Sequence, residues 1–87
     1  MMKKQASSQV TAAILEVVDN QLRDLTPPET KETYDRLVAS GISDKEARRL
    51  IAVALSNEMF QILKYQKDYS PERYIASLRK LPKLPWD

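Results

Sequence analysis

The chain has 87 residues and a net charge of +2, and it contains neither cysteine nor histidine. This length allows one domain, spanning residues 1–87, with little interior for a deep substrate cleft. Without cysteine or histidine there is no disulfide framework, no thiolate nucleophile and no zinc knuckle, and the commonest general base is missing. A single glycine among many good helix formers favours an all-α fold.

The sequence also argues against a membrane location. No apolar run approaches the roughly 18 residues of a transmembrane helix. The basic start, Met1 to Lys4, is followed by polar residues rather than by the apolar stretch of a secretory signal. We therefore expect a cytoplasmic protein.

Apolar residues recur every three or four positions near the start of the chain, which predicts a first helix from about Ser8 to Leu25. Ser7 or Ser8 could cap its beginning, and residues 1–6 are expected to be frayed. The stripe consists of Val10, Ile14, Val17, Val18, Leu22 and Leu25.

The segment Thr26-Pro27-Pro28-Glu29 predicts the start of a second helix. Thr26 is expected to cap it, Pro27 to take the first helical position, and Glu29 to complete a capping box. The helix should run to about Ser40 and end at Gly41, which is expected to adopt a left-handed conformation. Its inward-facing side chains are predicted to be Tyr34, Leu37 and Val38.

A second capping box, Ser43 to Glu46, predicts a long third helix from Asp44 to about Gln66. This helix is apolar almost all round. At roughly 100° per residue, Glu58 falls inside the main apolar cluster, and Val53 and Phe60 fall on nearly the opposite side. The cluster consists of Ala47, Ile51, Ala54, Ile62 and Tyr65.

Ser70-Pro71-Glu72 predicts the start of a fourth helix, which Pro82 ends. Residues 82–87 should form an extended tail that carries the only tryptophan, Trp86. Trp86 is expected either to fold back over the helices or to anchor a partner. These elements together predict a compact bundle of about four helices, with the long third helix at its centre.

Two interpretations fit the third helix. It could be the central post of the bundle, contacted by all the other helices. Alternatively, Val53 and Phe60 could form an interface to a second copy or to another protein, since small helical domains often complete a core by dimerising.

Glu58 needs a partner, because an ionised carboxylate on an apolar face is costly unless it is paired. Arg36 and Arg73 are the candidate cations, and the hydroxyls of Tyr34, Tyr65 and Tyr74 are further candidates. The sequence brings no second titrating group to Glu58, so a structural role is favoured over a catalytic one.

The basic start of the third helix allows an alternative function. The short link before it resembles a helix-turn-helix, and a weak nucleic-acid surface could include Lys45, Arg48, Arg49, Lys80 and Lys83. The rest of that helix is too apolar to lie in a DNA groove. Neither an acidic calcium loop nor a glycine-rich phosphate loop is present, so we expect no metal, cofactor or small-molecule ligand.

Several short motifs resemble a family of small bacterial all-helical domains of unknown function. The resemblance covers about Leu22 to Trp86, and members often carry histidine near the start of the third helix, where this chain has Arg48 and Arg49. It implies a helical fold and a bacterial cytoplasmic setting, and it supplies no activity. The motifs are Pro27-Pro28-Glu29, Arg36-Leu37, Gly41, Glu46-Ala47, Ile51, Glu58-Met59-Phe60, Tyr74 and Leu81-Pro82.

The sequence therefore predicts a non-enzymatic protein-interaction module that self-associates or binds another protein. The expected interface residues are Val53, Phe60 and Trp86. Weak nucleic-acid binding is the alternative function.

Overall fold

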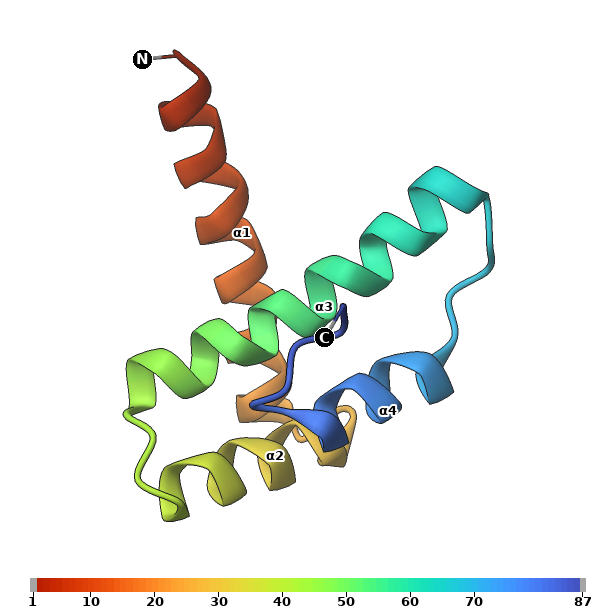
Figure 1. Cartoon of the computed structure of the whole chain (residues 1–87). Helices are drawn as coiled ribbons and strands as arrows, with labels where there is room; N and C mark the ends of the chain where they lie inside the picture. Colours follow the sequence, from red (N-terminus) through yellow and green to blue (C-terminus); the bar gives the residue numbers. More distant parts are fainter. Residues whose placement is uncertain (1, 87) are drawn as a thin grey trace.

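The computed structural model describes residues 2–86, with side chains from Val10 onward. These residues form four helices and no strand: α1 Met2–Asp24, α2 Pro28–Ala39, α3 Asp44–Tyr65 and α4 Pro71–Lys80. α3 packs against each of the other three helices, and α2 packs against both α1 and α4 (Figure 1). The predicted all-α bundle with a central third helix is confirmed.

Two helix starts and one helix stop follow the predicted capping signals. The Ser43 side chain accepts a hydrogen bond from the Glu46 N–H, and Ser70 accepts one from the Arg73 N–H. At the end of α2, Gly41 has a φ of +101°. The N–H groups of Gly41 and Ile42 donate to the carbonyls of Val38 and Leu37, so the turn is a Schellman motif.

The start of α2 differs from the prediction. The N-cap position belongs to Pro27 rather than Thr26, and no side chain caps it. The Thr26 hydroxyl instead donates to the backbone carbonyl of Asp24, so this threonine helps to close α1. Val38, which was expected to face inward, is 40% exposed.

α1 begins at Met2, earlier than the predicted start near Ser8. Helical backbone therefore includes residues 2–6, which were expected to be frayed, and Met1 lies outside the described residues. The predicted caps Ser7 and Ser8 fall inside the helix, and their side chains are outside the described part. The N-terminal half of α1 projects from the bundle, as does the end of α3 (Figure 1).

The core lies where α2, α3 and α4 meet the C-terminal half of α1. Its one buried residue from α1 is Val18, among the side chains described for that helix. Val10 and Val17, which belong to the predicted apolar stripe, remain exposed. The remaining buried apolar residues are Leu37, Ala47, Leu50, Ile51, Ala52, Ala54, Leu55, Tyr74, Leu78 and Leu81.

The tail after α4 is not extended as predicted. It turns at Leu81, where the Lys83 N–H donates to the carbonyl of Lys80, and turns again at Pro85. The turns direct the tail back toward α3 (Figure 1). Leu84 packs against the core, and this contact brings Trp86 beside α3.

Candidate functional site

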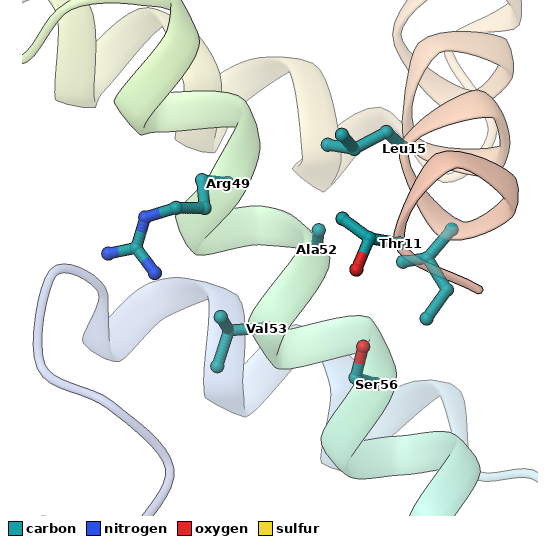
Figure 2. A pocket seen from close by; sticks show the side chains of 7 residues that line it. Thr11, Leu15, Arg49, Ala52, Val53 and Ser56 are labelled. Carbon is teal, nitrogen blue, oxygen red and sulfur yellow. The ribbon is translucent and has the colours of Figure 1, made fainter. Parts of the chain in front are cut away.

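A hollow of about 300 Å³ lies between α1 and the middle of α3. Ala52 and Ser56 of α3 face Thr11 and Leu15 of α1, whereas Val53 points to the other side of α3 (Figure 2). The small side chains of Ala52 and Ser56 leave the space that forms this hollow. Its full lining is Thr11, Ile14, Leu15, Arg49, Ala52, Val53 and Ser56.

A second hollow of about 490 Å³ lies between α3 and the C-terminal tail. It shares Val53 and Ser56 with the first hollow, and it is completed by Asn57, Phe60 and Trp86. The two hollows therefore adjoin on α3, one on the side of α1 and the other on the side of the tail. We call the two hollows together the α3 groove.

The fold brings together the three residues predicted for an interface. Val53, Phe60 and Trp86 all line the α3 groove. Phe60 is 50% exposed and Trp86 is 67% exposed, so Trp86 borders the groove without filling it. Scattered exposed apolar residues are normal on protein surfaces, but a hollow lined by several of them is typical of a binding site.

The groove continues into an aromatic cluster at the projecting end of α3. The rings of Phe60 and Tyr65 pack edge to face, with centroids 6.4 Å apart. The Lys64 ammonium lies 5.2 Å from the Phe60 centroid and 5.5 Å from the Tyr65 centroid. Met59 and Leu63 are also exposed here, and Leu63 is 78% exposed.

Glu58 lies outside the groove, on the buried side of α3. It is 3% exposed, and its carboxylate accepts two hydrogen bonds from the Arg73 guanidinium, at 3.0 and 2.8 Å. The backbone N–H of Ser70 donates a third hydrogen bond at 3.0 Å. Burial acts to raise the pKa of Glu58, but these hydrogen bonds and the nearby charges of Arg73 and Lys67 outweigh it and lower the pKa. The carboxylate is ionised and paired with Arg73, which fits the structural role that the sequence favours for Glu58.

The other groups considered as partners for Glu58 lie elsewhere. Arg36 was predicted as a partner, but its guanidinium donates to the carbonyls of Leu78 and Leu81 at the end of α4. A cation at this position is favourable because the last carbonyls of a helix are unpaired and carry partial negative charge. Tyr34 donates to Asp44, and Tyr74 donates to Gln21.

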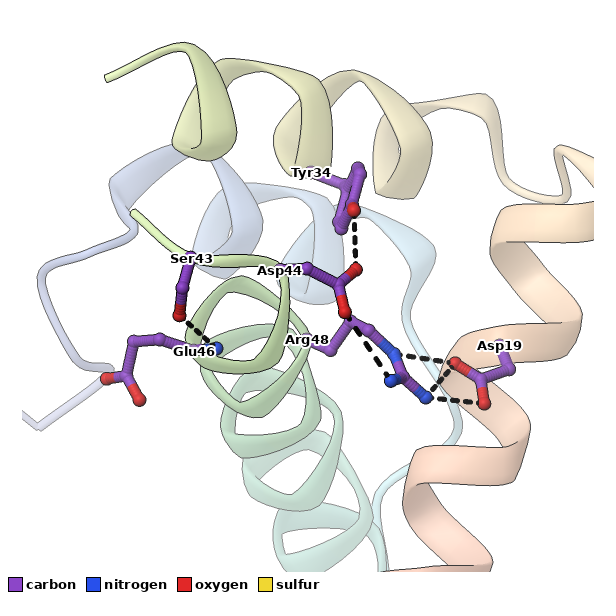
Figure 3. Close-up of polar contacts among 6 residues, drawn as sticks. All are labelled: Asp19, Tyr34, Ser43, Asp44, Glu46 and Arg48. Atoms are coloured by element: carbon purple, nitrogen blue, oxygen red, sulfur yellow. Dashed lines mark hydrogen bonds and ion pairs between the residues drawn. The ribbon is translucent and has the colours of Figure 1, made fainter. Parts of the chain in front are cut away.

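The arginines proposed for nucleic-acid binding, Arg48 and Arg49, are held in ion pairs, and Figure 3 shows those of Arg48. Arg48 makes a two-pronged contact with Asp19 of α1, at 2.8 and 2.6 Å, and lies 3.9 Å from Asp44. Arg49 contacts Glu46 in the same way, and this contact raises the pKa of Arg49 and lowers the pKa of Glu46. The carboxylates neutralise both guanidinium groups, which leaves less charge for phosphates.

Lys45, Lys80 and Lys83 are exposed. Lys45 lies at the start of α3, whereas Lys80 ends α4 and Lys83 lies in the tail. Arg48 and Arg49 are both on the first turns of α3. The predicted nucleic-acid residues are therefore shared between two parts of the fold.

In the part of the chain that the structure describes, no group of three or more carboxylate side chains is arranged to hold a metal ion. Among the same residues, none of the helices combines the length and apolar character that crossing a bilayer requires.

Sequence reasoning missed a buried polar network. Gln21 accepts hydrogen bonds from the Thr30 hydroxyl at 2.9 Å and from the Tyr74 hydroxyl at 2.7 Å. Burial raises the pKa of Tyr74 to about 12. Gln21 lies next to Leu22, which belongs to the apolar stripe predicted for the first helix. A polar residue beside that stripe was the one feature of the sequence that could have indicated this network.

Comparison of the chain with protein-family models, with curated proteins and with solved structures found no match.

Proposed function

We propose that this protein is a non-enzymatic interaction module that binds a protein partner, a second copy included, through the α3 groove. The observation that supports the proposal is the hollow between α3 and the tail, which brings together Val53, Phe60 and Trp86. Exposed aromatic residues at the edge of an apolar hollow are typical of the anchors that dominate binding energy. The predicted cytoplasmic location in a bacterium is part of the proposal.

The nucleic-acid alternative receives less support from the charges. Arg48 and Arg49 would have to leave Asp19 and Glu46 to contact phosphates. Binding through phosphates weakens steeply as salt is added, because it depends on the release of counterions. Association through an apolar groove persists in salt, so the two proposals predict opposite responses.

The proposal is tested by measuring solution molar mass with light scattering, over a range of concentrations and at low and high salt. We expect association that survives high salt in the parent and weakens at least about tenfold in Phe60→Asp, because the new carboxylate would be buried without a partner. Val38→Asp is the matched control, because Val38 is similarly exposed but lies on α2. A strict monomer at every concentration would contradict self-association, and equal effects of the two substitutions would exclude the α3 groove.

A further inference from the structure

The chain at the end of α4 has two backbone carbonyls whose usual helical donors are missing. They belong to Leu78 and Leu81, which are both buried. In an α-helix each carbonyl accepts from the N–H four residues later, and the residues at those two positions are Pro82 and Pro85. Proline has no N–H, so a helix that continued here could not satisfy either carbonyl in this way.

The Arg36 side chain of α2 supplies a donor to both carbonyls. Its guanidinium donates to the Leu81 carbonyl at 2.7 Å and to the Leu78 carbonyl at 3.0 Å. Among the described residues Arg36 forms no ion pair, whereas Arg48 and Arg73 are paired with carboxylates. The charge of Arg36 therefore acts on the end of α4, where the partial negative charge of the helix favours a cation.

This contact lies at the start of the tail that carries Trp86. Leu81 is 1% exposed, and residues 82–86 lead from it back toward α3 (Figure 1). Leu84 packs against the core, and Trp86 lines the hollow that it shares with Phe60. Two of these five residues are prolines, whose fixed φ gives the tail few ways to turn. A displacement at Leu81 is therefore carried along the tail to Trp86.

We propose that Arg36 is the positioning residue for the hollow between α3 and the tail. By holding the carbonyls of Leu78 and Leu81 against α2, it fixes the start of the tail and so keeps Trp86 at the hollow. Arg36 does not line the hollow itself, so it acts through the tail. The consequence for binding rests on the proposed function, because a wall that is already in place lowers the entropy cost of binding a partner.

Three substitutions test this role. Arg36→Met removes the guanidinium and keeps an unbranched apolar side chain. Arg48→Met is the matched control, because it makes the same change at an arginine that joins α3 to Asp19 of α1. Arg36→Lys keeps the charge, but an ammonium lacks the rigid fork of donors with which a guanidinium holds two acceptors.

Nuclear magnetic resonance of the protein alone measures the tail directly. In the parent we expect backbone order parameters of about 0.8 at Leu84 and Trp86, and nuclear Overhauser effects between the Leu84 methyl groups and the core. In Arg36→Met both order parameters should fall below about 0.6, and the Overhauser effects should disappear. Arg48→Met should keep the values of the parent, and Arg36→Lys should lie between the two.

Two results would overturn the positioning role. One is a tail in Arg36→Met that is as ordered as in the parent. The other is equal loosening in Arg36→Met and Arg48→Met, which would assign the effect to a general loss of stability. Circular dichroism establishes that each variant is folded, and if Arg36→Met is not, Arg36→Lys carries the same comparison with Arg48→Met.

Light scattering on the same variants separates this inference from the proposed function. We expect Arg36→Met to weaken association about fivefold, because the tail would then have to be ordered on binding. Unchanged association with a loosened tail would contradict the link between Arg36 and binding. A parent that is monomeric at every concentration would contradict self-association, whereas the position of Trp86 is decided by the resonance measurements alone.

Discussion

The Glu58 carboxylate ties the end of α3 to the start of α4. It accepts from the guanidinium of Arg73 in the first turn of α4, and from the N–H of Ser70, which caps that helix. Arg73 also donates to the backbone carbonyl of Asp68, so the pair holds the connecting segment. A buried charge with three hydrogen bonds is a joint between two helices, and it lies outside the groove.

Substitution of Glu58 tests this role through stability. Glu58→Ala should lower the free energy of unfolding by about 2 kcal/mol, because it leaves Arg73 and the Ser70 N–H without their acceptor. The cost stays moderate because the Arg73 side chain is 37% exposed, and water replaces part of the lost contact. Glu58→Gln keeps an acceptor oxygen and should cost less.

Chemical denaturation gives these values, and Glu32→Ala is the control, because Glu32 is exposed on α2 and should change stability by less than about 0.5 kcal/mol. Stability equal to the parent in both Glu58 variants would mean that the carboxylate is solvated.

The turn between α2 and α3 depends on a single glycine. Gly41 holds a positive φ, and its position lets two backbone N–H groups satisfy the last carbonyls of α2. Ser43 follows at once as the cap of α3, so one helix stops and the next begins within four residues. This short connection sets α2 beside the first half of α3 and leaves the second half free to project.

Gly41→Ala should lower the free energy of unfolding by about 1 kcal/mol, because an L side chain is strained at this φ. Apart from the glycine and its two chain neighbours, no residue has an atom within 4 Å of the place where a Cβ would stand, so the cost comes from the backbone alone. Gly41→Asn should cost less, because asparagine tolerates left-handed conformations better than alanine does. Thermal or chemical unfolding of the three proteins checks this order. Equal losses for alanine and asparagine would show that the backbone conformation is not the cause.

Side chains from three helices of the bundle meet at the half-buried amide of Gln21. Its side-chain oxygen receives the hydroxyl of Thr30 from α2 and the hydroxyl of Tyr74 from α4. Tyr74 is fully buried, so its phenol is kept neutral and its pKa is raised to about 12. This network fixes how the C-terminal half of α1 sits on the other helices, and therefore where its projecting half lies relative to the groove.

The raised pKa makes stability depend on alkaline pH. In the unfolded chain Tyr74 ionises near its ordinary pKa of about 10, whereas the folded chain keeps the proton up to about 12, so unfolding releases a proton between these values. Stability should therefore fall as pH rises from about 10 to about 12, by up to about 3 kcal/mol.

Tyr74→Phe should lose about 1 kcal/mol at neutral pH, because the hydrogen bond to Gln21 is gone, and it should lack this alkaline decline. Denaturation at several pH values measures both effects. Tyr65→Phe serves as the control, because Tyr65 is exposed and should keep the decline. An alkaline decline of the same size in Tyr74→Phe would assign it to another group.

Across the whole molecule, the local signals in the sequence predicted the elements well. Ser43, Ser70 and Gly41 mark the ends of helices because each satisfies backbone groups within a few residues of itself. The burial of Glu58 also follows from its place on the apolar side of one helix. Such features depend on neighbours in the chain, which the sequence shows directly.

The predicted cap of α2 and the predicted extended form of the tail were wrong for a related reason, whereas the expected fold-back of the tail agrees with the contact of Leu84 with the core. Thr26 and Pro85 carry strong local preferences, but contacts outside their own motifs decided the structure in both places. The Thr26 hydroxyl donates to the carbonyl of Asp24 at the end of α1 instead of capping α2. The tail turns back because Leu84 packs against the core.

By itself the sequence determined an all-α chain with capped helices and a third helix more apolar than one buried face needs. Only the tertiary structure decided that Arg36 caps α4, that Arg48 pairs with Asp19, and that Ala52 and Ser56 floor a groove beside Trp86. The physical reason is the range of the interactions. Caps and periodicity act over one or two turns of a helix, whereas these contacts depend on the angles at which whole helices cross and on where the tail comes to rest.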